Sequence, residues 1–251
     1  MTPLLVSALV FVSIFAGAVV GMALRSALPD EQLGPDSKEV VRLATSLIVT
    51  MSGLVLGLLV SSASTSYQGQ KNDVASLASQ VIIMDHLLQT YGPETYSLRV
   101  EMRKLLKANV DRAWPQEADT KFALKPSEHG EEFYQQLQDL VPANNVQIDA
   151  KGQIMSLALT LRQNQWLMFL KSDQNAVPYV LLCVVVSWLV MTYVSFGLFA
   201  PPNATVIATL ALSAVAVTAA IFIIIELYSP FTGILRISSA PVRDVLDQLP
   251  R

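Results

Sequence analysis

Small and hydroxylated residues recur at helical spacing along the second of four long apolar stretches. At about 100° per residue they fall within one sector of a helix about 100° wide. These residues are Arg42, Ser46, Thr50, Gly53, Gly57, Ser61 and Ser64. Hydroxyl groups and exposed backbone are groups that can meet a partly dehydrated ion. This pattern predicts that Thr50, Gly53, Gly57 and Ser61 line an aqueous pathway in an oligomer, with Arg42 attracting charge at one mouth.

Helix packing explains the same face equally well. Gly53 and Gly57 are four residues apart, and this small-xxx-small spacing lets two helix backbones approach closely in a membrane. Gly17 and Gly21 in the first apolar stretch have the same spacing, and the motif often occurs by chance. Both interpretations of the second stretch remain open on the sequence alone.

Glu226 is an acidic residue at the edge of the fourth apolar stretch. A carboxylate held near lipid tends to face the protein interior and to find a partner there, which makes Glu226 a candidate functional residue. Arg42 and Arg236 are its natural partners. The alternative is that Glu226 reaches water at the headgroup level.

Residue types that carry catalysis are sparse. The chain has 2 His and 1 Cys, and it lacks a zinc-protease motif, a phosphate-binding loop, a dinucleotide fingerprint and a nucleophile elbow. Asp85 and His86 are adjacent, and neighbouring residues on a helix do not face each other. We therefore expect no enzyme activity, no cofactor and no metal site. A net charge of −3 also argues against a nucleic-acid partner.

Most of these candidate residues lie in or next to stretches that the composition predicts to be membrane-spanning helices. The sequence is 52% hydrophobic and 15% charged, and a bilayer core about 30 Å thick needs about 20 helical residues. Stretches of that length and character cover residues 3–24, 43–63, 177–200 and 204–226. The last two are separated by a short proline-rich link, which predicts antiparallel neighbours. The sequence predicts an all-α integral membrane protein with four transmembrane helices, whose first two spans form a hairpin over residues 1–63.

A hydrophilic helical insert is predicted over residues 64–176, between spans two and three. Apolar residues at helical spacing continue to Leu88 and resume at Leu98, and Gly92 and Pro93 break the pattern between them. The second helix should end before Pro115. A loop over 114–130, a short helix over 131–140 and a helix over 153–170 follow. An N-cap for the second span is predicted at residues 36–39, and residues 229–251 form a juxtamembrane tail after the second membrane hairpin, 177–228.

Orientation follows from the distribution of basic residues. Four spans place both termini and the insert on one side, which holds 14 of the 17 Lys and Arg residues. The positive-inside rule then predicts a multi-pass protein of the inner (plasma) membrane with both termini and the insert in the cytoplasm.

Four segments of the sequence carry a resemblance to a known family. They are the string ELYSPFTGILRISSAPVR at 226–243, SFGLFAPPNAT at 195–205, the end of the second span at 53–67, and YGPE at 91–94. Together they resemble the bestrophin-like family of small, mostly bacterial membrane proteins, and the resemblance covers nearly the whole chain. Bestrophins proper are pentameric anion channels whose second helix lines the pore, with cytoplasmic termini and a helical cytosolic part between spans two and three. This chain has no counterpart of their aromatic pore neck or acidic calcium clasp.

Two hypotheses of function follow. In the first, the protein is a homo-oligomeric, bestrophin-like anion channel whose second span lines the pathway. In the second, it is a non-conducting membrane scaffold whose cytoplasmic insert binds an unidentified protein partner, because amphipathic helices suffice for that role. The expected partners are therefore the lipid bilayer, further copies of the chain, and anions or a cytoplasmic protein.

Overall fold

The computed structural model describes residues 2–29, 34–114, 128–174, 177–231 and 233–250. The chain divides into two compact units. One comprises Met1–Ser66 and Val177–Tyr228, and the other Tyr67–Ala176 and Ser229–Arg251. Residues 229–251, which the sequence sets apart as a tail, thus belong to the second unit.

Four helices of the described residues are long and apolar enough to cross a membrane, which confirms the predicted fold class of an all-α protein with four transmembrane helices. They are α1 (Pro3–Ala27), α2 (Pro35–Tyr91), α6 (Tyr179–Phe199) and α7 (Ala204–Leu227). A helix is the natural solution here, because within lipid it satisfies every backbone polar group internally.

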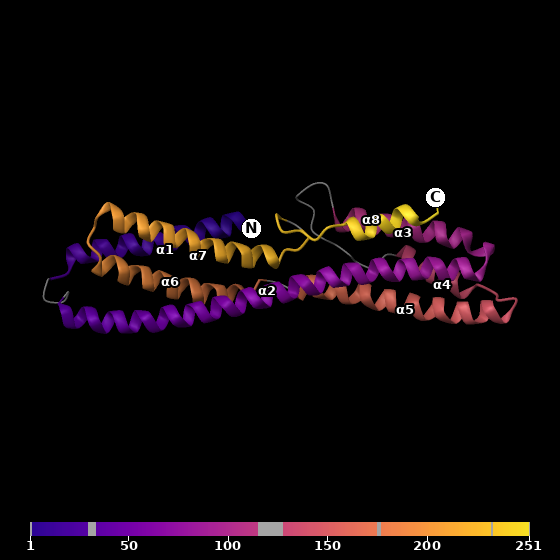
Figure 1. Cartoon of the computed structure of the whole chain (residues 1–251), viewed down its shortest axis with the longest axis horizontal. Coiled ribbons are helices and arrows are strands. Elements are labelled where there is room, and N and C mark those ends of the chain that lie inside the picture. The colour runs from indigo at the N-terminus through magenta and orange to yellow at the C-terminus, as the bar shows by residue number, and fades with distance from the viewer. Residues whose placement is uncertain (1, 30–33, 115–127, 175–176, 232, 251) are drawn as a thin grey trace. The chain divides into compact units, whose positions relative to one another are not determined.

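Helix α1 is the packing centre of the first unit. It lies directly against both α6 and α7 (Figure 1). A Cβ atom on Gly21 would collide with the carbonyl oxygen of Val194, and one on Gly197 would collide with that of Ala18. These glycines therefore let the backbones of α1 and α6 approach closely, as small residues do at helix interfaces in membranes.

The link between α6 and α7 is as short as the sequence predicts. Helix α6 ends at Phe199, and α7 begins at Ala204, where the Asn203 side chain accepts a hydrogen bond from the backbone N–H of Val206 at 2.9 Å. The hydroxyl groups of Tyr193 and Ser213 lie 2.9 Å apart and connect the two helices. The prediction that these helices are neighbours is therefore confirmed by a side-chain contact. The backbones of α6 and α7 pack most closely against α1.

Helix α2 continues far beyond the membrane-length segment. It runs for 57 residues from Pro35 to Tyr91, so one helix crosses the boundary at residues 63 and 64 that the sequence predicts between the second span and the insert. No proline interrupts residues 36–92, and the helix ends where Gly92 adopts a φ of 143° before Pro93. The helix also begins at Pro35, just before the predicted cap; proline suits a first helical position because its missing N–H would be unbonded there anyway.

The second unit is built from the C-terminal part of α2 and four further α-helices. These are α3 (Tyr96–Ala113), α4 (Glu128–Gln138), α5 (Asn145–Gln174) and α8 (Ala240–Gln248), with a 3₁₀ turn, η2 (Pro93–Thr95), before α3. The predicted helix at 131–140 begins earlier, and the one at 153–170 extends further at both ends. Most of the predicted loop, residues 115–127, lies outside the described residues.

The tail packs into the core of the second unit. Ile237, Val242, Val245 and Leu249 are all buried there, and α8 lies against α3. The Trp114 indole donates a hydrogen bond to the carbonyl of Ile237 at 2.9 Å, and Arg103 donates to that of Leu249 at 3.0 Å. Apolar burial and two side-chain hydrogen bonds therefore hold this segment in place.

Candidate functional site

The small and hydroxylated face of α2 is exposed along its whole length. Arg42, Ser46, Thr50, Gly53, Gly57, Ser61 and Ser64 are all solvent-accessible in the single chain. The buried positions of this part of α2 are Thr45, Ser52, Leu59 and Ala63, which lie about 120° away around the helix axis. The helix therefore packs within its own chain through a different face from the one predicted to line a pathway.

Gly53 and Gly57 make no close packing inside the chain. A Cβ atom built on either residue meets no other described atom within 4 Å. On α1, by contrast, a Cβ on Gly17 would lie 3.0 Å from the carbonyl oxygen of Val190. The same glycine spacing thus serves packing in α1 and leaves an open surface in α2, so within one chain the packing interpretation is wrong for Gly53 and Gly57.

Two of the four hydroxyl groups on this face are bonded to their own helix. Ser46 donates to the carbonyl of Arg42 at 2.8 Å, and Thr50 donates to that of Ser46 at 2.9 Å. A hydroxyl that has donated its hydrogen presents only oxygen lone pairs to its surroundings. In this rotamer the hydroxyls of Ser46 and Thr50 offer acceptors. The positive charge on this face comes from Arg42.

Glu226 lies at the opposite end of the first unit from Arg42. It is 2% exposed near the end of α7, which favours the interior position over contact with headgroup water. Two residues later, the Tyr228 hydroxyl lies 3.2 Å from that of Ser62 on α2. Arg42 is 20 residues before Ser62, or about 30 Å along a helix. The suggested pairing of Glu226 with Arg42 is therefore wrong because of distance.

Arg236 belongs to the second unit. Its side chain is exposed, and it precedes the buried Ile237 in the segment that leads into α8. Its suggested pairing with Glu226 stays a prediction.

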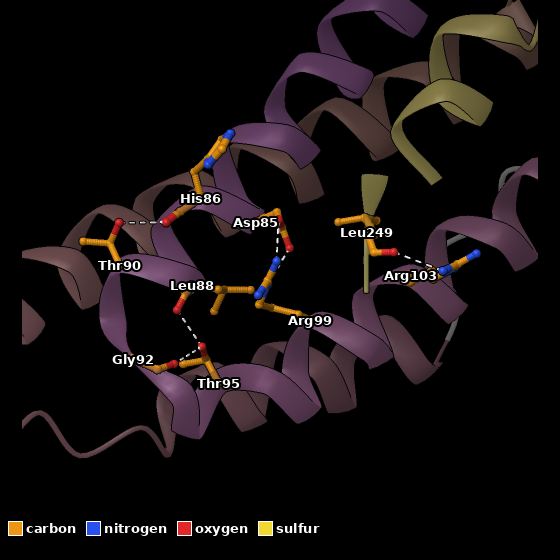
Figure 2. A network of polar contacts seen from close by, with 9 residues as sticks. All are labelled: Asp85, His86, Leu88, Thr90, Gly92, Thr95, Arg99, Arg103 and Leu249. Carbon is orange, nitrogen blue, oxygen red and sulfur yellow. Dashed lines mark hydrogen bonds and ion pairs between the residues drawn. The ribbon is translucent and has the colours of Figure 1, made fainter. Parts of the chain in front are cut away.

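A bidentate ion pair joins α2 to α3, and the sequence analysis missed it. Figure 2 shows the Arg99 guanidinium against the Asp85 carboxylate, with Nε 2.7 Å from Oδ1 and Nη2 2.9 Å from Oδ2. This hydrogen bonding raises the pKa of Arg99 above its ordinary value, against a smaller lowering by burial. The signal was present in the sequence, because opposite charges stand seven residues before and seven after Gly92.

The turn between these helices is held by Thr95. Its hydroxyl lies 2.5 Å from the carbonyl oxygen of Leu88 and 2.8 Å from that of Gly92 (Figure 2). His86 is exposed, and its carbonyl accepts from Thr90 at 2.8 Å. Asp85 therefore pairs with Arg99 rather than with its neighbour His86, as the helix geometry predicts.

Possible metal ligands were compared throughout the described residues of the two units. Across the described ranges, no group of three or more His, Cys, Asp or Glu side chains is placed to hold a metal ion. The exposed α2 face therefore offers hydroxyl oxygens, backbone and one guanidinium as its chemistry.

Comparison with known proteins identifies a family over most of the chain. A family model described as the Bestrophin-like domain matches residues 12–242, a range that includes the α2 face, most of α1, the other three spans and most of the second unit. No curated protein and no solved structure matches the sequence. The chain therefore belongs to the Bestrophin-like domain family.

Proposed function

We propose that several copies of this membrane protein assemble around an ion pathway lined by the α2 face, and that the pathway conducts anions. The observation that carries the proposal is the exposed face itself, in which Thr50, Gly53, Gly57 and Ser61 are left uncovered by their own chain. Family membership supports the channel class.

An oligomer is required because one helix face cannot enclose water. Glycine has no side chain, so Gly53 and Gly57 leave space beside α2. Assembly with the α2 faces turned inward would place that space and the neighbouring hydroxyl groups around a common pathway. The exposed leucines on the other side of α2, such as Leu54 and Leu58, then contact lipid or a neighbouring chain.

The sign of the ion follows from Arg42. Because Ser46 and Thr50 donate to their own helix, a ring of arginines at the mouth is the source of positive potential that would concentrate anions. Arg42 is exposed at the first turns of α2, where it remains free to meet such ions.

Ion flux from liposomes tests this proposal. The purified protein, at a measured oligomeric state, is reconstituted with chloride and potassium gradients tested separately. We expect chloride flux that Gly57→Leu reduces by about tenfold, because a large side chain narrows a pathway lined by this face. Ala44→Leu is the matched control, since Ala44 is exposed on α2 outside the sector, and it should leave flux unchanged.

Two results would contradict the channel. One is a well-folded oligomer that seals the liposome against both ions, and the other is chloride flux that is identical in wild type and Gly57→Leu. Potassium flux in place of chloride flux would keep the pathway and remove the anion assignment.

A specific surface favours the scaffold as the second candidate. Val141, Val146 and Ile148, around the connection between α4 and α5, are exposed by 85%, 62% and 54%. Adjacent exposed apolar side chains are common at protein-binding surfaces. A sealed oligomer in the flux experiment would make this surface the place to seek a protein partner.

A further inference from the structure

The second unit contains a cavity, open to solvent on one side, that the proposed ion pathway does not use. It has a volume of about 410 Å³ and lies among α2, α3, α4, α5 and α8. Ligand pockets for small molecules commonly span about 300–1,000 Å³, so the cavity is large enough for one.

The floor of the cavity is apolar and buried. Met84 on α2, with Val110 and Ala113 on α3, is no more than 3% exposed. Such a surface favours hydrocarbon over water, because a water molecule there would find too few polar partners.

The mouth of the cavity carries opposite charges. Arg162 on α5 and Glu131 on α4 line it and pair with each other, with Nη1 3.5 Å from Oε1 and a shorter contact between Nη2 and Oε2. Their side chains are 45% and 47% exposed. The Arg162 guanidinium also lies 5.5 Å from the centre of the Tyr134 ring, another lining residue.

We propose that this cavity binds a lipophilic carboxylate, with its hydrocarbon part on the apolar floor and its carboxylate on Arg162. Glu131 already places one carboxylate on this guanidinium, which shows that the geometry suits the group. A half-exposed ion pair of this kind contributes little to stability. A second carboxylate that carries an apolar tail can therefore replace Glu131, because burial of the tail adds a favourable term that Glu131 lacks. The proposal is independent of the ion pathway.

Tryptophan fluorescence makes the binding measurable in the full-length protein. Trp114 and Trp166 line the cavity, and the chain's third tryptophan, Trp188, lies in α6. In a Trp188→Phe background reconstituted in nanodiscs, 9,10-dibromostearic acid should quench fluorescence saturably at one molecule per chain. Bromine quenches at short range, so acid that stays in the bilayer gives only a non-saturating background.

Two cavity-filling variants and one matched control locate the quenching. Ala158→Phe and Ala113→Leu each add bulk at a lining residue that is buried, and both should abolish the saturable component. Ala108→Phe adds bulk on the exposed face of α3, and it should leave quenching unchanged. Thermal unfolding of each variant checks that loss of quenching is not loss of structure.

Displacement by unlabelled competitors tests the role of Arg162. Stearic acid should displace the probe better than octadecanol. Arg162→Gln should weaken the binding of stearic acid by about tenfold, the scale of one charge-assisted hydrogen bond. It should leave the binding of octadecanol unchanged. Glu131→Gln should strengthen the binding of stearic acid, but not that of octadecanol, because it removes the competing carboxylate.

The proposal is overturned by absence of saturable quenching in the Trp188→Phe protein. It is equally overturned by quenching that survives in both folded cavity-filling variants, since the probe would then reach the tryptophans from outside. The assigned head-group contact would be refuted if Arg162→Gln changed the displacement of the probe by neither stearic acid nor octadecanol.

Discussion

Asp85 and Arg99 illustrate what single residues contribute to the second unit. Their side chains are 13% and 18% exposed, and two parallel hydrogen bonds join them across the α2–α3 turn. Removing one partner leaves the other charge partly buried and uncompensated. The resulting loss of free energy of unfolding exceeds the net stabilisation that the intact pair provides. The pair therefore specifies how the two helices align.

Loss of this pair should destabilise the protein measurably. We expect Arg99→Met to lower the free energy of unfolding by about 1–3 kcal/mol, seen as a lower midpoint in thermal unfolding. Lys104→Met is the control, because the Lys104–Glu101 pair is far more exposed, at 70% and 36%, and its loss should have little effect. Equal destabilisation by both substitutions would contradict this account.

The pH dependence of the Arg99 contribution has a definite sign. The folded-state pKa of Arg99 is raised, so its stabilisation is complete below the ordinary arginine pKa and is lost only as the pH rises through the raised value. The difference between wild type and Arg99→Met should therefore stay constant from neutral to mildly alkaline pH.

At the scale of elements, two helices use the same glycine spacing for different purposes. Gly17 and Gly21 lie in the close contact between α1 and α6, whereas Gly53 and Gly57 on α2 face open space in the single chain. Helix α1 is therefore tied to its neighbours within the chain, while α2 keeps a free face for contact with other molecules.

Alanine substitution should separate these two uses. Gly21→Ala should destabilise the folded protein by about 1–3 kcal/mol, because overpacking forces backbones apart. Gly53→Ala should be neutral or stabilising, by up to about 1 kcal/mol, because alanine favours helix more than glycine does. Thermal unfolding in detergent measures both effects. If Gly53→Ala instead dissociates the oligomer, this face packs against another copy and does not line a pathway.

At the scale of the whole molecule, the helical insert and the tail form one unit. The buried Ile237, Val242 and Val245 place the tail in the core that α2 to α5 build. The insert and the tail thus share one core, although more than 150 residues separate Val74 in α2 from Leu249 in the tail. The insert and the tail should therefore lie on the same side of the membrane.

Sidedness can be measured with introduced cysteines. In a Cys183→Ser background, we expect Ala108→Cys, an exposed position on α3, to react with an impermeant maleimide only from the cytoplasmic side. Pro29→Cys, an exposed position after α1, should react only from the opposite side. The basis is the excess of Lys and Arg on the side of the insert. The reverse labelling pattern would invert the predicted orientation, and labelling of both from one side would refute the four-span topology.

Composition and local patterns in the sequence were enough to predict the class of the protein and most of its helices. Membrane spans could be predicted because lipid excludes unbonded backbone, so apolar length alone identifies them. The break at Gly92 and Pro93 was equally predictable, since it depends on local backbone chemistry. The exposed face of α2 was visible as a pattern, because 100° per residue is a local property of any helix.

Which helix faces meet could not be predicted from the sequence, because it depends on tertiary packing. The spacing of the glycines is the same in α1 and α2, so the local pattern does not distinguish them. They differ only in the helices that surround them in space. The central place of α1, the docked tail and the cavity all depend on residues far apart in sequence. Their positions follow from the packing of whole helices, and spacing within one helix carries no information about that packing.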